Sequence, residues 1–213
     1  MRKLLFMAVL LAVKLAPAFG QTDWKLRADN NGIKVYSSII PSSKIKAIKV
    51  EATFDASAQQ LAAVVMDVST STEWVSHLKS AILIKRVSAN ELYYYSEVDL
   101  PWPAANRDFV AHLTVSQDPD TKVITVDGPA VPGYMPVKKG IVRITNSTGK
   151  WIITPLGQSQ AKVEYSIHVD PGGSLPSWLV NMFSTQTPME VFKNLRAQLQ
   201  KPESKNMVLA LMQ

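Results

Sequence analysis

The ionisable and nucleophilic side chains of this sequence form no arrangement that is typical of an enzyme. Its three histidines, His77, His112 and His168, lack the i, i+4 spacing with which a helix presents a pair of metal ligands. The chain has no cysteine, which excludes thiol catalysis and cysteine metal sites. It also has no nucleophile elbow, phosphate-binding loop or dinucleotide fingerprint. We therefore predict a protein that is not an enzyme, with no catalytic residue, no metal and no cofactor.

One arginine has a charge that needs an explanation. Strand alternation places Arg107 on the same face as Phe109, opposite Asp108. If that face lines an apolar cavity, the guanidinium needs a partner, because an unpaired buried ion is costly. We expect this partner to be Glu97 or Asp99 on the same face of the preceding strand. The alternative is that Arg107 and Asp108 only tie a loop to the sheet.

A long helix is predicted from about Pro176 to Gln200, and it carries a broad apolar stripe. Pro188 lies inside this helix and lacks an amide hydrogen, which predicts a kink near Ser184. Such a stripe can form a core or contact a ligand, and flexible methionines favour the second role. The ligand-contact candidates on the helix are Trp178, Met182, Phe183, Met189 and Phe192.

The remaining elements are mostly strands. Two capping boxes, Ser57-x-x-Gln60 and Thr70-x-x-Glu73, predict two short helices. Short turns separate several of the strands, which favours antiparallel pairing. The order predicts one α+β domain, a curved antiparallel sheet with the long helix across its concave face, and a frayed tail after Pro202. The strands are expected at 33–40, 48–54, 82–87, 91–100, 107–117, 122–127, 141–146, 151–156 and 162–169.

The first twenty residues resemble a cleaved secretory signal peptide. Arg2 and Lys3 precede an apolar run at 4–13, and small residues at Ala18 and Gly20 suit cleavage after Gly20. The alternative is a membrane anchor, but Lys14 interrupts a run that would need about 20 apolar residues to span a bilayer. We expect export to the periplasm or the exterior, where a chain without disulfides depends on its core for stability.

The charge of the chain argues against a nucleic-acid partner. The formal charge is +6, and cleavage removes three positive residues and no acidic one, which leaves +3. Lysine and arginine are scattered, so a solvated surface is favoured over one that docks on anionic membranes, although transient membrane contact stays open. We expect a monomer.

The decisive segment is PWPAANRDFV at residues 101–110, which closely resembles the PWP…RDFV signature of the START (StAR-related lipid transfer) domain. Further similar segments follow in the family's order and cover about residues 23 to 200. They are WKL at 24–26, NGIKVY at 31–36, EWV at 73–75, GKW at 149–151 and DPGG at 170–173.

The resemblance implies a helix-grip fold, in which a curved sheet wraps around a C-terminal helix and encloses a lipid-sized tunnel. It implies a lipid, sterol or other hydrophobic ligand, a role as carrier or sensor, and a gate formed by residues 100–106, with Trp102, and by the final helix. It also implies that an acid/base pair inside the tunnel, here Arg107 with Glu97 or Asp99, contacts the polar group of the ligand, with Phe109 on the same face as Arg107. The START-like domain would span 21–202, between the signal peptide at 1–20 and a tail at 203–213. Two alternatives remain: a cyclase- or hydrolase-like enzyme of the same superfamily that uses Arg107 with Glu97 or Asp99, and a scaffold with a filled tunnel.

Overall fold

The structure is a computed structural model that describes residues 23–41, 43 and 45–209. The expected signal peptide at 1–20 lies outside the described residues and stays a prediction.

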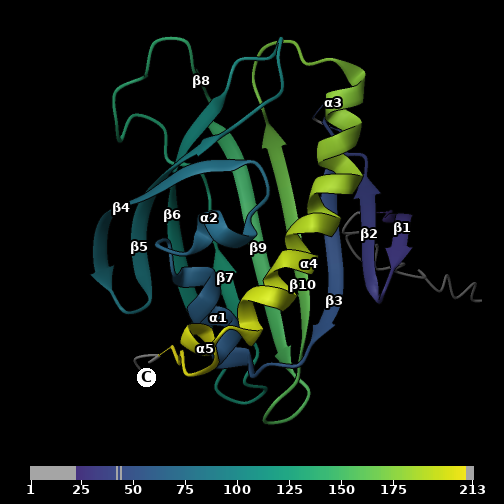
Figure 1. Cartoon of the computed structure of the whole chain (residues 1–213), viewed down its shortest axis with the longest axis vertical. Coiled ribbons are helices and arrows are strands. Elements are labelled where there is room, and N and C mark those ends of the chain that lie inside the picture. Colours follow the sequence, from purple (N-terminus) through teal and green to yellow (C-terminus); the bar gives the residue numbers. More distant parts are fainter. Residues whose placement is uncertain (1–22, 42, 44, 210–213) are drawn as a thin grey trace, which may run out of the picture.

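Nine strands form one curved antiparallel sheet, in the order β1-β2-β3-β10-β9-β7-β6-β5-β4 (Figure 1). A two-residue strand, β8 (Val142–Arg143), pairs in parallel with the start of β6. The nine strands are β1 (Lys25–Asn30), β2 (Ile33–Ser38), β3 (Ala47–Phe54), β4 (Leu78–Ser88), β5 (Glu91–Val98), β6 (Arg107–Gln117), β7 (Ile124–Asp127), β9 (Asn146–Pro155) and β10 (Ala161–Asp170).

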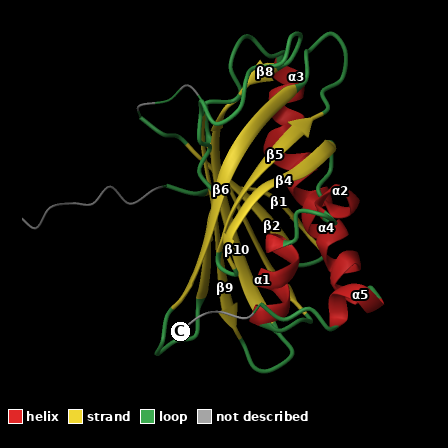
Figure 2. Ribbon diagram, turned by 90° about the vertical axis from the view of Figure 1, so that its left-hand side faces the viewer, coloured by secondary structure: helices red, strands yellow, loops and turns green. Residues whose placement is uncertain are grey.

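The helices gather on one side of this sheet, as Figure 2 shows. The C-terminal helix runs 24 residues along the sheet and has three parts: α3 (Ser177–Asn181), the π-helical turn η1 (Met182–Gln186) and α4 (Thr187–Gln200). The predicted α+β helix-grip architecture is therefore confirmed. The shorter helices are α1 (Ala58–Met66), α2 (Ser71–Trp74) and α5 (Pro202–Lys205).

The disturbance expected near Ser184 takes the form of the π-helical turn η1. Pro188 has no amide hydrogen to donate, and a wide turn just before it accommodates this missing bond. The hydroxyl of Ser184 donates to the carbonyl of Val180 at 2.5 Å within this region. Pro176, where the helix was expected to begin, is the residue that precedes α3.

The two expected capping boxes differ in outcome. Ser57 caps α1, because its hydroxyl accepts the amide hydrogen of Gln60 at 3.1 Å. The side chain of Gln60 does not return to Ser57, and donates instead to the carbonyls of Leu199 and Ser204. Thr70 makes no cap bond to α2, so the second box is wrong; its hydroxyl donates to Asp67.

The chain after Pro202 is not frayed along its first residues. It forms α5, where Ser204 is 1% exposed and receives the bond from Gln60. Lys201 adds an ion pair with Glu73 at 2.6 Å. These contacts join the end of the final helix to α1 and α2, and so they order the segment up to Lys205.

A strand expected over 141–146 is also wrong. Only Val142 and Arg143 pair with β6, and β9 begins at Asn146. The amide of Ile144 donates to the carbonyl of Asp108 at 2.8 Å, and the Arg143 side chain reaches the carboxylate of Asp108. Residues 142–144 thus attach the loop that precedes β8 to the start of β6.

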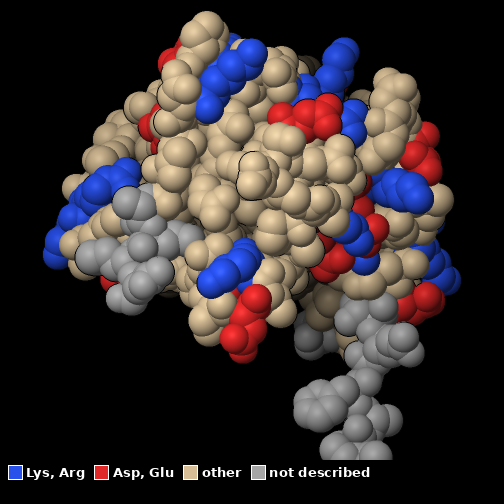
Figure 3. All heavy atoms as spheres, turned by 90° about the horizontal axis from the view of Figure 1, so that it is seen from below, with Lys and Arg blue, Asp and Glu red and all other residues tan. Residues whose placement is uncertain are grey.

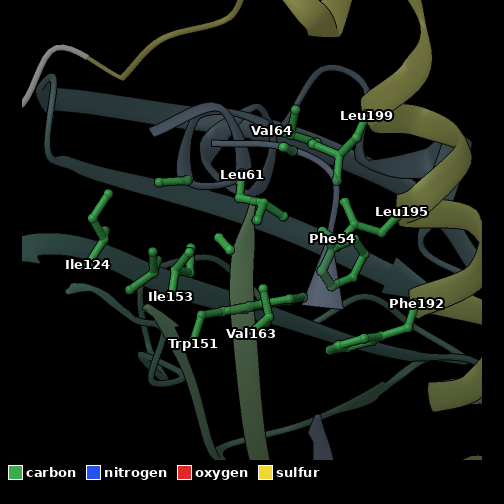
Figure 4. Close-up of a cluster of buried hydrophobic side chains, with 14 of the residues drawn as sticks. Phe54, Leu61, Val64, Ile124, Trp151, Ile153, Val163, Phe192, Leu195 and Leu199 are labelled. Carbon is green, nitrogen blue, oxygen red and sulfur yellow. The ribbon is translucent and has the colours of Figure 1, made fainter. Parts of the chain in front are cut away.

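In the orientation of Figure 1, where α1 and α5 are at the lower end and α3 is at the upper end, the solid core lies in the lower part of the space between the sheet and the helices. Figure 4 shows that Leu195 and Leu199 of α4 and Leu61 of α1 meet side chains of the sheet, among them Ile153 and Val163. At the end of the molecule seen in Figure 3, lysine and arginine are interspersed with aspartate and glutamate.

Replacement of Ser57 by alanine should lower the free energy of unfolding by about 0.5–2 kcal/mol, because the first turn of α1 loses its cap bond. Urea denaturation followed by circular dichroism measures the change. Ser116→Ala, exposed on β6, is the control for loss of a serine hydroxyl, and an equal loss in both variants would contradict the assigned cap.

Candidate functional site

A cavity of about 390 Å³ lies above the solid core, between the sheet and the upper part of the final helix. Most of the residues that line it are apolar and come from β3, β5, β6, β10 and the helix. Trp151 and Phe192 stack with ring centroids 5.7 Å apart, and both border the cavity and the core. The cavity therefore begins where the core packing ends.

The register between β5 and β6 decides which side chains enter this cavity. Arg107 is paired with Val98, and Phe109 with Ser96, so these four side chains share the face toward the helix. Asp108 and its partner Glu97 lie on the opposite face. The expectation that Glu97 shares a face with Arg107 is wrong by one residue of register, and such a slip exchanges the two faces of a strand.

Arg107 lines the cavity, is 4% exposed and binds backbone carbonyls in place of an acid. Its Nε donates to Pro171 O and its Nη2 to Gly172 O, both at 3.0 Å, and its Nη1 donates to Ala105 O. No ion pair of the described residues includes it, so the expected pair with Glu97 or Asp99 is wrong. Burial lowers the pKa of Arg107.

Glu97 has its own partners outside the cavity. Its Oε1 accepts bonds from Lys79 at 2.9 Å and from the amide of Asn106 at 3.0 Å, and these bonds, with that from Lys79 first, lower the pKa of Glu97. Asp99 follows the end of β5, is exposed and does not line the cavity. Glu97 thus fixes the loop that precedes β6.

Asp108 is fully buried and holds a second loop. Its two carboxylate oxygens accept bonds from Arg143 at 2.7 and 3.0 Å, and Arg143 also donates to the carbonyls of Met135 and Pro136. The alternative reading, in which Arg107 and Asp108 tie loops to the sheet, therefore describes their contacts. Ligand contact by Arg107 stays a prediction.

The other candidates divide between the cavity and the surface. Phe109, Phe183 and Phe192 line the cavity, whereas Trp102 is 89% exposed and Trp178 is 50% exposed. Met182 and Met189 do not line it either. In an unbroken α-helix, residues spaced by four positions rotate gradually around the helix axis. The wider π-helical turn offsets this rotation, so that residues spaced by four stay on the cavity side and Met182 and Met189 lie outside that row. The helix residues that do line it are Leu179, Val180, Phe183, Ser184, Thr187, Pro188, Val191 and Phe192.

The sequence analysis did not predict three polar groups of the cavity wall. The hydroxyls of Ser96 and Thr187 and the indole N–H of Trp74 are buried and have no hydrogen-bond partner among the described residues. An unmet buried polar group costs about 1–3 kcal/mol, so each favours a bound molecule that offers a partner. Ser96 could have been identified only with the register known, because it is paired with Phe109, which was already a candidate.

Two tyrosines complete the polar part of the wall. Burial raises the pKa of Tyr94 to about 12, and burial together with the neighbouring Tyr94 raises the pKa of Tyr165. Both phenols therefore remain protonated at neutral pH. Tyr165 also stacks on Trp151 at 4.3 Å.

The described ranges, 23–41, 43 and 45–209, contain no group of three His, Cys, Asp or Glu residues that could hold a metal ion. No helix in this part of the chain is long and apolar enough to cross a bilayer. The chemistry that the lining residues offer is apolar contact, neutral hydrogen bonding and the charges of Arg107 and Lys46.

The START domain model matches residues 9–205, which is most of the sequence. The chain belongs to the START domain family. A relative in Pseudomonas aeruginosa, an uncharacterized protein, is 36% identical over 94% of this chain and all of its own length. The bovine phosphatidylcholine transfer protein is 29% identical over 78% of each chain.

Solved structures agree with this assignment. The crystal structure of a STAR-related lipid transfer protein from Xanthomonas axonopodis has a TM-score of 0.76 and is 35% identical, and the match covers 84% of this START domain chain and 99% of the other.

The Glu97 carboxylate should make stability depend on pH. Its folded pKa is lowered, so its contribution is present above the unfolded value of about 4.3 and is lost as the pH falls through the folded pKa. Glu97→Gln should therefore lose less unfolding free energy than the wild type between about pH 6 and pH 3. Urea denaturation at each pH measures this difference. The control is Glu190→Gln on the exposed side of α4, which should follow the wild type; identical pH profiles for all three proteins would contradict the role of Glu97.

Proposed function

We propose that this START-domain protein binds one hydrophobic, lipid-like molecule in the cavity and carries it between membranes, without a chemical step. The observation that carries the proposal is the apolar cavity between the sheet and the upper half of the final helix. The relatives named as lipid transfer proteins support it. We also propose export, on the sequence of residues 1–20 alone.

Affinity in such a cavity comes from the apolar wall. Burial of apolar surface contributes about 25 cal/mol per Å², so an alkyl chain has a sufficient driving force for entry. Shape alone discriminates weakly among apolar molecules, and selectivity must come from the few polar groups. In this wall those groups include Arg107, Ser96, Thr187 and the two tyrosines, and Lys46, which is exposed, adds a second cation.

Ligand entry would require the loops at the upper end to separate. Arg107 joins Ala105, in the loop between β5 and β6, to Pro171 and Gly172, in the loop before α3. The amide of Val142 in β8 donates to Asn106 O at 3.0 Å and links the third loop. We propose that opening breaks the Arg107 bonds and moves residues 100–106 away from the final helix.

The same end is the proposed point of membrane contact. Figure 1 shows β8 and α3 at this end, where β10 finishes and β6 begins. Trp102, Val137 and Trp178 are exposed there at 89%, 69% and 50%. Apolar side chains that are held in water favour insertion into a lipid interface, and Lys138 and Lys139 beside Val137 favour anionic lipids.

Val98→Trp should abolish ligand occupancy, because Val98 lines the cavity and an indole at this position fills part of it. Native mass spectrometry of the protein isolated from cells measures the bound mass, and the same spectrum reports whether residues 1–20 have been removed. The matched control is Val87→Trp on the outer part of β4, which is 47% exposed in the wild type and lies away from the cavity. A ligand retained by Val98→Trp, or a wild-type protein that stays free of ligand in mixed lipids, would contradict binding in this cavity.

Trp102→Ala should slow lipid transfer between vesicles by several-fold and leave equilibrium binding unchanged, because the exposed indole lies outside the cavity. Fluorescence dequenching of a labelled lipid measures the transfer rate. Leu156→Ala, in the turn between β9 and β10 at the opposite end, is the control for loss of an exposed apolar side chain. Equal rates for wild type and Trp102→Ala would remove this loop from the membrane contact.

A further inference from the structure

Two arginines near the start of β6 have partners of different kinds. Arg143 is paired with both oxygens of Asp108 on the outer face. Arg107, on the cavity face, meets three carbonyl oxygens and no carboxylate among the described residues. Carbonyl dipoles satisfy hydrogen bonds but leave the net charge of a guanidinium uncompensated. The positive charge in the cavity therefore lacks a counter-ion from the described chain.

Arg107 also has unused hydrogen-bonding capacity. A guanidinium carries five N–H groups in a fixed planar fork. The Nε group and one hydrogen on each terminal nitrogen go to the carbonyls, so the second hydrogen of Nη1 and that of Nη2 remain. The lowered pKa of Arg107, whose cause is burial, agrees with a cation that would gain from an anion.

A free hydroxyl lies on the same face of the sheet as this cation. Ser96 is paired with Phe109, the residue two positions after Arg107 on β6, so Ser96 and Arg107 are diagonal neighbours on one face of the sheet. Ser96 is 1% exposed, lines the cavity and has no hydrogen-bond partner among the described residues. Thr187 adds a second free hydroxyl from the helix side, at 8% exposure.

The size of the cavity limits the apolar part of the ligand. Its volume of about 390 Å³ lies near the lower end of the range of about 300–1,000 Å³ for pockets that enclose drug-sized molecules. A single alkyl chain suits this volume, whereas a lipid with two long chains would require the walls to move apart.

We propose that the ligand is a single-chain amphiphile with an anionic oxygen head group, a carboxylate or a phosphate monoester, which binds Arg107 and Ser96. The chain extends along the apolar wall toward Trp151 and Phe192. This inference rests on the proposed function and adds the charge and the chain number of the ligand. A charge-assisted hydrogen bond to a buried guanidinium is strong enough to select an acid over its neutral ester.

The test compares two fluorescent probes with the same tail, cis-parinaric acid and its methyl ester. The wild-type protein should bind the acid at least about ten-fold more tightly, as expected for a hydrogen bond between charged groups. Arg107→Gln should remove this preference, and Arg107→Lys should retain part of it. Ser96→Ala should weaken acid binding by about three-fold or more and leave ester binding unchanged. The control Ser116→Ala, exposed on β6, should change neither affinity.

Competition then distinguishes the sources of the head group. Displacement of the probe by oleate assigns a carboxylate, displacement by lysophosphatidate assigns a phosphate, and either result supports the proposal. Equal affinities for acid and ester in the wild type would overturn it and leave lipid binding itself intact. Displacement by phosphatidylcholine vesicles alone would also overturn it. If no probe and no lipid binds, the proposed function fails as well. Should Arg107→Gln not fold, the wild-type comparison and Ser96→Ala still decide.

Discussion

The upper end of this molecule depends on one guanidinium that lies in an apolar cavity. Three carbonyl oxygens, from Ala105, Pro171 and Gly172, meet its N–H groups there, because a buried guanidinium without partners would be costly. These carbonyls belong to loops that are far apart in the sequence. The same bonds that satisfy the cation therefore join these loops at one end of the cavity.

The final helix has to meet two opposing requirements. Its lower half packs through Phe192, Leu195 and Leu199 against the solid core, while its upper half must stay apart from the sheet. The π turn η1 lies in the upper half, just before Pro188. It keeps one row of side chains directed at the cavity, and its irregular hydrogen bonding is a site at which a helix can bend. The position of this turn is consistent with movement of the upper half while the lower half holds the fold.

Sequence periodicity could predict the architecture and the faces within a strand, but not the register between strands. Alternation correctly placed Arg107 with Phe109, and it placed Glu97 wrongly because the register of β5 depends on a loop whose length fixes no pairing. Likewise, Ser57 and Thr70 carry the same capping pattern, yet Thr70 turns to Asp67. Gln60, Glu73 and Lys201 contact segments that are more than a hundred residues away, and local patterns cannot encode such partners.

The unpaired polar groups of the wall link ligand occupancy to stability. Ser96, Thr187 and the indole of Trp74 each carry a desolvation cost in the folded chain that a bound polar group or water would reduce. A ligand that satisfies them stabilises the folded state by mass action, in proportion to the logarithm of its concentration relative to Kd. A carrier must also release its ligand, and release restores these costs. Each additional satisfied bond would therefore raise affinity mainly by slowing the release of the ligand.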